Sequence, residues 1–125
     1  MTITLYGIPN CDTVKKARNW LDAHQVQYVF HDFKKAGVTK ELIQGWLTGL
    51  SWEVLLNRKG TTWRKLDDAT RAGVVDAVSA MALMLENPSC IKRPVLDLGL
   101  HAAPRFHAGF NDAMYQSLFS TPSRS

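Results

Sequence analysis

A cysteine at the turn from a strand into a helix constrains this chain more than any other feature of its sequence. The apolar residues 3–6 predict a strand, which Gly7 and Pro9 end. Apolar residues at helical spacing then predict a helix with a buried face of Val14, Ala17 and Leu21. Cys11 therefore lies where the first N–H groups of a helix lack partners and the helix dipole leaves partial positive charge. Such a position binds anions and favours the thiolate form of a cysteine.

Basic side chains follow the cysteine in the first two turns of the predicted helix, at Lys15, Lys16 and Arg18. Cations at a helix N-terminus oppose the helix dipole and cost about 0.3 kcal/mol or more each. Their repetition indicates an anion site, in which they would lower the pKa of Cys11. The alternative is that they are solvated surface cations. Asp12 acts in the opposite direction if its carboxylate faces the sulfur, or it caps the helix and faces away.

Composition favours a single domain whose cysteines are reduced. With 125 residues and 46% hydrophobic residues, the chain can bury a core of its own. The formal net charge of +4 is scattered in basic pairs, so nucleic-acid binding is not expected. Two cysteines do not make a disulfide framework. Met1 leads directly into a strand pattern and no apolar run approaches a membrane span, so we expect a cytoplasmic protein without membrane contact.

Further strand patterns complete an α/β arrangement. They lie at residues 26–33, 91–98 and 104–108. The order βαβ, helical block and ββα predicts a thioredoxin-like fold with a mixed four-stranded sheet and an inserted helical subdomain. The chain would form one domain over residues 1–125. We expect residues 1–37 and 88–120 to form the thioredoxin-like core, and residues 38–87 to form the helical insertion.

The helical block contains recognisable starts and stops. Residues 34–37 predict a turn, Thr39 and Ser51 predict the N-caps of two helices, and residues 57–62 predict a polar loop. Residues 74–85 predict a further helix. Its expected buried face is Val74, Val78, Met81 and Leu85. The block's core is expected to contain Trp46, Trp52 and Trp63.

Caps are also predicted for the two helices of the thioredoxin-like core. Asp12 or Thr13 is the expected cap of the first helix, and Asn111 that of the last. Phe110 is expected to pack on Tyr115 as a hydrophobic staple. The last residues predict a polar, frayed tail over 120–125.

Four segments of the chain resemble the arsenate reductase (ArsC)-like family, and in particular its YffB-type branch, to which the Spx regulators are related. They are Gly-Ile-Pro-Asn-Cys-Asp-Thr-Val-Lys-Lys-Ala at 7–17, Leu-Leu-Asn at 55–57, Lys-Arg-Pro-Val at 92–95 and Gly-Phe-Asn at 109–111. The resemblance covers residues 2–119. It implies a nucleophilic cysteine at Cys11, a cis proline at Pro94 and an anion-binding arginine at Arg93.

The sequence departs from the patterns of these relatives. Arsenate reductases of this type place three arginines around the cysteine, of which only Arg93 is matched. Asn57 stands at the first arginine position with Arg58 next to it, and Ala108 stands near the third with Arg105 before it. The Spx regulators carry a Cys-x-x-Cys switch, whereas this chain has Val14 as the fourth residue of that motif.

The candidate catalytic residues are therefore Cys11 as nucleophile and Arg93 as the ligand of an anionic group. Candidate substrate-binding residues are Asn10, Asp12, Thr13, Lys15, Arg58 and Pro94. The four histidines show no ligand spacing with the cysteines, so no metal is expected. Cys11 would act as a monothiol, resolved by glutathione, by a glutaredoxin-like partner or by Cys90. For Cys90 we favour a packing role.

These residues favour a monomeric, glutathione-dependent thiol–disulfide reductase with Cys11 as nucleophile. Glutathione would be a co-substrate rather than a bound cofactor, and glutathionylated proteins or a small oxyanion would be the substrate. The alternative, from another class, is a regulatory module that binds RNA polymerase through the helical block, as the resemblance to Spx implies. True arsenate reduction is a third and narrower option.

Overall fold

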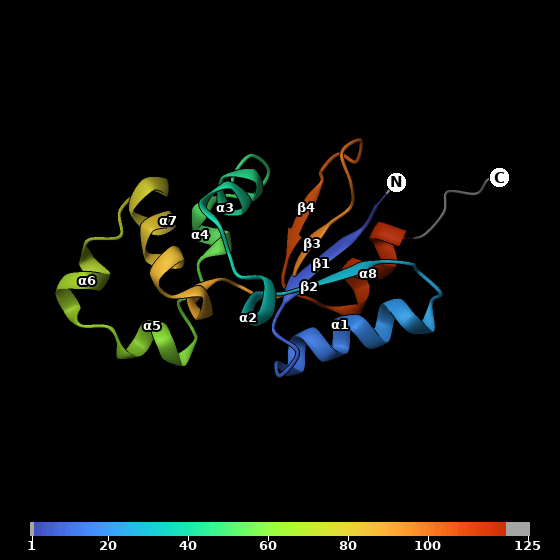
Figure 1. The fold of residues 1–125 in the computed structure, drawn as a ribbon, viewed down its shortest axis with the longest axis horizontal. Coiled ribbons are helices and arrows are strands. Elements are labelled where there is room, and N and C mark those ends of the chain that lie inside the picture. Colours follow the sequence, from blue (N-terminus) through green and yellow to red (C-terminus); the bar gives the residue numbers. More distant parts are fainter. Residues whose placement is uncertain (1, 120–125) are drawn as a thin grey trace.

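The computed structural model describes residues 2–119, so the predicted tail at 120–125 lies outside the described residues. The described chain forms a four-stranded sheet with helices, shown in Figure 1. The elements in chain order are β1 (Thr4–Gly7), α1 (Asp12–Ala23), β2 (Val29–Asp32), α2 (Phe33–Ala36), α3 (Lys40–Trp46), α4 (Trp52–Leu55), α5 (Thr61–Lys65), α6 (Asp68–Ala72), α7 (Ala77–Glu86), a 3-10 turn η1 (Pro88–Cys90), β3 (Val95–Asp97), β4 (Phe106–Ala108) and α8 (Asp112–Phe119).

The strands are ordered β2-β1-β3-β4 in the sheet. β1 pairs in parallel with β2 and antiparallel with β3, and β3 pairs antiparallel with β4. The predicted α/β fold with a mixed four-stranded sheet is therefore confirmed. The strands are shorter than predicted, because each contains only the residues that pair with a neighbour: β3 spans Val95–Asp97, for example, within the predicted 91–98.

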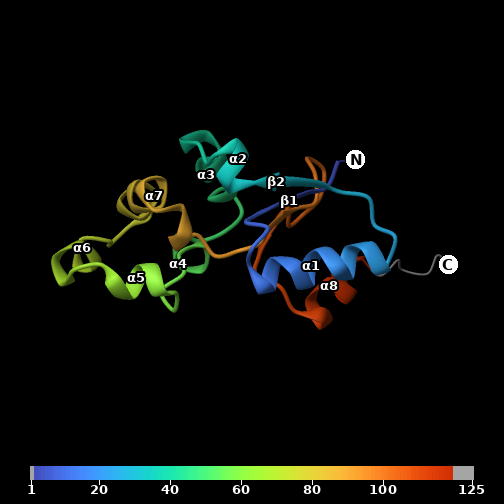
Figure 2. The ribbon, with the colours of Figure 1, turned by 60° about the horizontal axis from the view of Figure 1, so that its bottom comes forward.

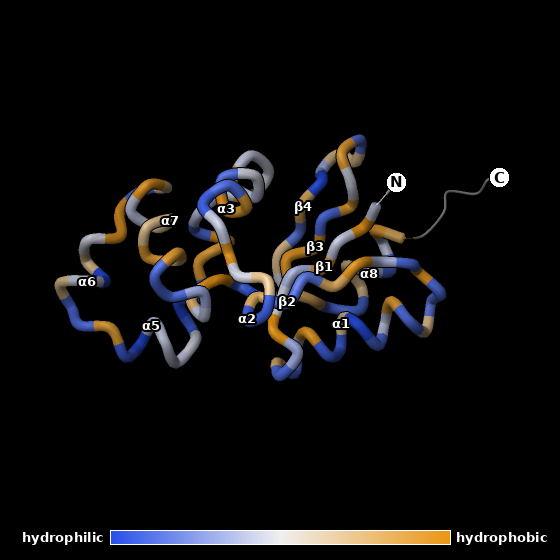
Figure 3. The backbone as a smooth tube through the Cα atoms, in the orientation of Figure 1, coloured by the Kyte–Doolittle hydropathy of each residue, from blue (hydrophilic) through white to orange (hydrophobic). Residues whose placement is uncertain are grey.

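Helices α1 and α8 lie against the same face of the sheet, as Figure 2 shows. Figure 3 shows hydrophobic and hydrophilic residues alternating along α1, as expected for a helix with one buried face. Asn111 caps α8, since its Oδ1 accepts the N–H of Met114 at 2.7 Å. Phe110 packs on Tyr115 as predicted, with ring centroids 4.6 Å apart. The cluster between these helices and the sheet contains Leu5, Ala17, Trp20, Leu21, Leu96 and Tyr115.

A second hydrophobic cluster joins the sheet to helices α3, α4, α5 and α7. Its members come from both parts and include Ile43, Trp46, Met84, Val95 and Phe106. Trp46 is only 1% exposed and packs edge-on against Tyr6 of β1, with ring centroids 5.2 Å apart. The helices α3, α4, α5 and α7 thus share a core with the sheet, whereas α6 contributes no residue to it. The division into a core of 1–37 and 88–120 and an insertion of 38–87 stays a prediction. No helix in residues 2–119 is both long and apolar enough to span a membrane.

A short backbone ladder ties the end of α4 to the segment before β3. The N–H of Asn57 donates to the carbonyl of Cys90 at 2.7 Å, and the N–H of Lys92 donates to the carbonyl of Leu55 at 2.7 Å. Between these bonds, Leu56 and Ile91 form an antiparallel bridge. This 55–57/90–92 ladder places residue 57 beside the segment that enters β3.

Two segments that were predicted as a turn and a loop contain short helices. In the predicted turn 34–37, the chain forms α2 because the Asp32 carboxylate accepts the N–H of Lys34 at 2.8 Å and caps the helix. In the predicted loop 57–62, α5 already begins at Thr61. The predicted caps at Thr39 and Ser51 are confirmed, as each side chain accepts a backbone N–H three residues later.

The predicted buried face of helix α7 is confirmed only in part, because Met81 and Leu85 are partly buried against the second hydrophobic cluster but do not form its centre. The helix begins at Ala77 because Asp76 and Ser79 form a capping box, with each side chain bonded to the other's backbone N–H. Val78, predicted to be buried, is 71% exposed. The buried residues are Ala80, Leu83 and Met84. Because nearly every residue of α7 is apolar, several faces fit helical spacing, and only the packing against neighbouring helices selects one.

We expect that replacing Arg105 destabilises the fold. The Asp97 side chain is 8% exposed and accepts hydrogen bonds from Arg105 Nε at 2.7 Å and Nη2 at 3.0 Å. Arg105→Met leaves this carboxylate without its cation, which should lower the free energy of unfolding by about 1–3 kcal/mol in urea denaturation. The control is Arg71→Met, because the Asp68 carboxylate that Arg71 pairs with is 98% exposed. An equal effect of both variants would contradict this account of Asp97.

Candidate active site

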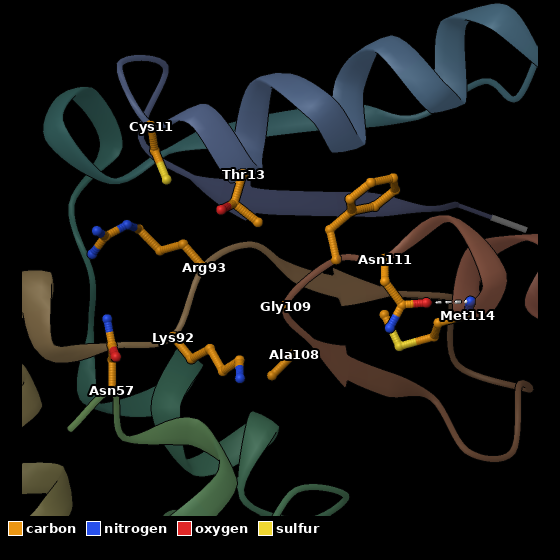
Figure 4. A pocket seen from close by; sticks show the side chains of 10 residues that line it. Cys11, Thr13, Asn57, Lys92, Arg93, Ala108, Gly109, Asn111 and Met114 are labelled. Carbon is orange, nitrogen blue, oxygen red and sulfur yellow. Dashed lines mark hydrogen bonds between the residues drawn. The ribbon is translucent and has the colours of Figure 1, made fainter. Parts of the chain in front are cut away.

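A pocket of about 430 Å³ contains Cys11. Figure 4 shows that it lies between the N-terminus of α1, the segment entering β3 and the turn from β4 to α8. It is lined by Cys11, Thr13, Asn57, Lys92, Arg93, Ala108, Gly109, Phe110, Asn111 and Met114. This lining contains two cations, Lys92 and Arg93, and no carboxylate. The pocket is therefore suited to a ligand that carries negative charge.

Cys11 is itself the N-cap of α1, with an extended backbone at φ −111° and ψ 128°. Its carbonyl accepts the N–H of Lys15 at 2.9 Å, which starts the helix. The prediction that Asp12 or Thr13 is the cap is wrong, because both already lie in the first turn. The Cys11 side chain makes no capping hydrogen bond of regular geometry, and its sulfur points into the pocket in Figure 4.

The electrostatics around the sulfur favour the thiolate. Burial by itself raises the pKa of the Cys11 thiol, but the net shift of this pKa is downward. The backbone N–H of Val14, the guanidinium of Arg93 and the N–H of Thr13 outweigh the burial. The helix N-terminus and Arg93 therefore both lower the pKa of Cys11.

The three cations of the first helical turns do not line the pocket. Lys15 and Lys16 are exposed. Arg18 donates from Nε to the hydroxyl of Tyr28 at 3.3 Å, and its guanidinium lies 4.1 Å from the centre of the Phe30 ring. These three side chains therefore lie outside the pocket lining, and their predicted contribution to an anion site at Cys11 stays a prediction.

Arg93 is held by the backbone of the segment that precedes it. Its Nη1 donates to the carbonyls of Ser89 at 3.0 Å and Ile91 at 3.4 Å. Its Nε is buried and has no hydrogen-bond partner among residues 2–119. The Arg93–Pro94 peptide bond is cis, as the family resemblance implies. A fixed guanidinium thus lies beside the Cys11 thiol with donor capacity left for an anionic ligand.

The predicted substrate-binding residues lie in different surroundings. Thr13 lines the pocket, and Pro94 is buried behind it, where its carbonyl accepts the N–H of Gly109 at 2.8 Å. Exposed residues outside the lining are Asn10, Asp12, Lys15 and Arg58. The Arg58 guanidinium lies 5.3 Å from the centre of the Trp52 ring. A binding role for these four residues stays a prediction, for ligand groups that extend beyond the pocket.

Most of the lining was missed by sequence reasoning. The missed residues are Asn57, Lys92, Ala108, Gly109, Phe110, Asn111 and Met114. A signal was available, since Lys92 and residues 109–111 belong to segments that carry the family resemblance. These segments come together only through the pairing of β3 with β4 and through the 55–57/90–92 ladder.

Asn57, which the resemblance aligns with the first arginine position of arsenate reductases, and Ala108, which it places near the third, both line this pocket. The arginines nearest to them in sequence do not replace them, because Arg58 is outside the lining and Arg105 is paired with Asp97. Among the described residues, no group of three or more His, Cys, Asp or Glu can hold a metal ion.

Cys90 is buried in the second hydrophobic cluster, with 1% of its surface exposed. Burial raises the pKa of its thiol, and the charge of Arg93 opposes this shift without cancelling it. Its environment therefore favours the inert thiol, in contrast to that of Cys11. This agrees with the packing role that we favoured from the sequence.

Comparison with known proteins places the site in a family. The sequence matches the ArsC family over residues 6–118. The chain therefore belongs to the ArsC family, and its fold is the thioredoxin-like fold of ArsC-type proteins.

Individual relatives agree with this assignment. The solved structure of a YFFB protein has a TM-score of 0.84 and 49% identity, covering 93% of this chain and 97% of its own. An uncharacterized protein of Haemophilus influenzae is 39% identical over 94% of this chain and 99% of its own length. The global transcriptional regulator Spx of Streptococcus agalactiae is 32% identical over 88% of this chain and 77% of its own.

We predict that Arg93 sets the reactivity of Cys11. The Arg93→Met substitution removes a charge that lowers the Cys11 pKa, so this pKa should rise and alkylation at neutral pH should slow. The measurement is the rate of iodoacetamide modification against pH in a Cys90→Ser background. The parent should show a midpoint below the ordinary value of about 8.5. Arg64→Met, on the exposed surface of α5, is the control and should leave this midpoint in place. An unmoved midpoint in Arg93→Met would rule out this role.

Proposed function

We propose that this protein is a cytoplasmic, glutathione-dependent thiol–disulfide reductase in which Cys11 is a monothiol nucleophile. One observation carries the proposal: the N-cap cysteine of α1 has a lowered pKa and lies beside Arg93 in a pocket without carboxylates. The thiolate is the reactive form in thiol–disulfide exchange, so a lowered pKa increases the reactive fraction at neutral pH. Membership of the ArsC family supports the general class of thiol-dependent reductase.

The proposed first step uses a mixed disulfide between a protein thiol and glutathione. The Cys11 thiolate attacks the glutathione sulfur and forms a new S–S bond. The old S–S bond breaks, and the protein sulfur leaves with the electron pair and takes a proton from water. Arg93 would bind an anionic group of this substrate with its second Nη, since Nη1 already donates to backbone carbonyls.

In the second step the thiolate of another glutathione attacks the glutathione sulfur bound to Cys11. Oxidised glutathione forms, and Cys11 leaves as a thiolate. The groups that lower the Cys11 pKa also make it a better leaving group here. In sum, one mixed disulfide and one glutathione give one protein thiol and one oxidised glutathione. A glutaredoxin-like partner can supply the second thiol in place of glutathione.

Arsenate is a less suitable substrate for this pocket. The resemblance places one arginine of such reductases at Asn57 and another near Ala108, whereas here the pocket lining offers a bound oxyanion one guanidinium, from Arg93. Lys92 adds an ammonium, which is a point charge and lacks the planar fork that binds two oxygens together. We therefore rank a glutathione mixed disulfide above arsenate.

A second candidate function is regulatory binding, which the 32% identity to Spx favours. Exposed valines on α4 and α7 and between α6 and α7 would then contribute to a partner surface, namely Val54, Val75 and Val78. Affinity capture from extract separates the candidates: a polymerase subunit retained by a protein without thiol turnover would favour regulation.

The test of the proposed function is turnover of a glutathionylated peptide. Formation of oxidised glutathione is followed through NADPH consumption by added glutathione reductase. Cys11→Ser should abolish the catalysed rate because it removes the nucleophile. Cys90→Ser is the matched control and should retain the rate, since Cys90 is 1% exposed and takes no part in either step. Undiminished turnover in Cys11→Ser, or its loss in Cys90→Ser, would refute the monothiol mechanism.

A further inference from the structure

We infer that Lys92 is a carboxylate-binding residue of the Cys11 pocket and selects thiol ligands that carry a carboxylate, such as glutathione, over uncharged thiols. The inference rests on the thiol chemistry proposed for Cys11 and adds a ligand determinant to it. Three features carry it: the direction of the Lys92 side chain, the space that Gly109 leaves for it, and the absence of a carboxylate partner in the described chain.

The first feature is the division of charge within the pocket. Lys92 and Arg93 are neighbours in the chain, but Figure 4 shows their side chains extending in opposite directions along the pocket. The guanidinium lies on the side of Cys11 and Asn57, and the ammonium lies on the side of Ala108. Arg93 therefore lies beside the reacting sulfur of Cys11, while Lys92 would face a part of the ligand that is distant from the S–S bond.

The second feature is the contact between Lys92 and Gly109. A Cβ at position 109 would lie 2.8 Å from Lys92 Cε, and the backbone there has a φ of +81°. Glycine suits this backbone conformation, and its lack of a Cβ leaves room for the Lys92 side chain in its present position. Backbone hydrogen bonds hold both ends of the contact, from Lys92 to Leu55 and from Gly109 to Pro94. The stem of Lys92 thus passes beside Gly109 at the pocket wall, and the residue as a whole is exposed, so its ammonium is open to a ligand.

The third feature is an unneutralised charge. Within residues 2–119, no Asp or Glu forms an ion pair with Lys92, in contrast to Arg105, which is paired with Asp97. Asn111 also lines the pocket, but its Oδ1 accepts the N–H of Met114. A carboxylate brought by the ligand would supply the missing partner through a charge-assisted hydrogen bond. Glutathione carries a carboxylate on each side of its thiol-bearing residue, so it has the required chemistry.

The test measures how well a ligand protects Cys11 from iodoacetamide in a Cys90→Ser background. S-methylglutathione keeps both carboxylates and has no reactive thiol, and its dimethyl ester blocks both carboxylates. S-methylglutathione should protect the parent about tenfold more strongly than the Lys92→Met variant, as expected for the loss of one charge-assisted hydrogen bond. The dimethyl ester should protect both proteins weakly and equally. Lys65→Met, an exposed lysine of α5 outside the pocket, should behave as the parent.

Equal protection of the parent and Lys92→Met by S-methylglutathione would overturn the inference. It would also be overturned if the Lys92→Met substitution weakened protection by the dimethyl ester as much as protection by S-methylglutathione. Alkylation without ligand gives an independent readout of the Cys11 pKa. Its pH midpoint should not move in Lys92→Met, and a moved midpoint would show that Lys92 acts on the thiol instead of on the ligand. Because protection requires no turnover, failure of the peptide assay refutes the proposed reductase without deciding this inference.

Discussion

The candidate site depends on the 55–57/90–92 ladder. Its two backbone hydrogen bonds join the end of α4 to the segment before β3, and the buried side chains of Leu55 and Ile91 anchor both sides. Arg93 comes directly after this ladder, and Asn57 and Lys92 are part of it. The pairing holds Asn57 next to Lys92 and Arg93, although α4 and β3 are separated in the chain by α5, α6 and α7.

The core of the fold could be predicted because its signals are local. The strand β1, which ends at Gly7, the amphipathic face of α1 and the cap at Asn111 each depend on residues close in sequence. The register of the strands and the buried face of α7 could not be predicted. Both depend on partners distant in the chain, and the uniformly apolar sequence of α7 is compatible with more than one packing face, as the exposed Val78 shows.

The same distinction applies to the site. Cys11 could be identified from its turn, and Arg93 from its place before a proline in a segment that resembles the ArsC family. Lys92, by contrast, joins the pocket through backbone pairing with Leu55 and through the space at Gly109, and neither is visible in the sequence. Lys15 was favoured because it is close to Cys11 in sequence, although it is exposed and lies outside the pocket lining. Closeness in sequence is a poor guide to a site assembled from four separate segments.

The central claim is that Cys11 accepts glutathione without help from a second cysteine of the chain. Intact-mass spectrometry of wild-type and Cys90→Ser protein after exposure to oxidised glutathione tests it most directly. We predict one glutathione per chain, located on Cys11 in both proteins and removed by reduced glutathione. A disulfide between Cys11 and Cys90 in the wild type, or a Cys11 that stays unmodified, would contradict the account.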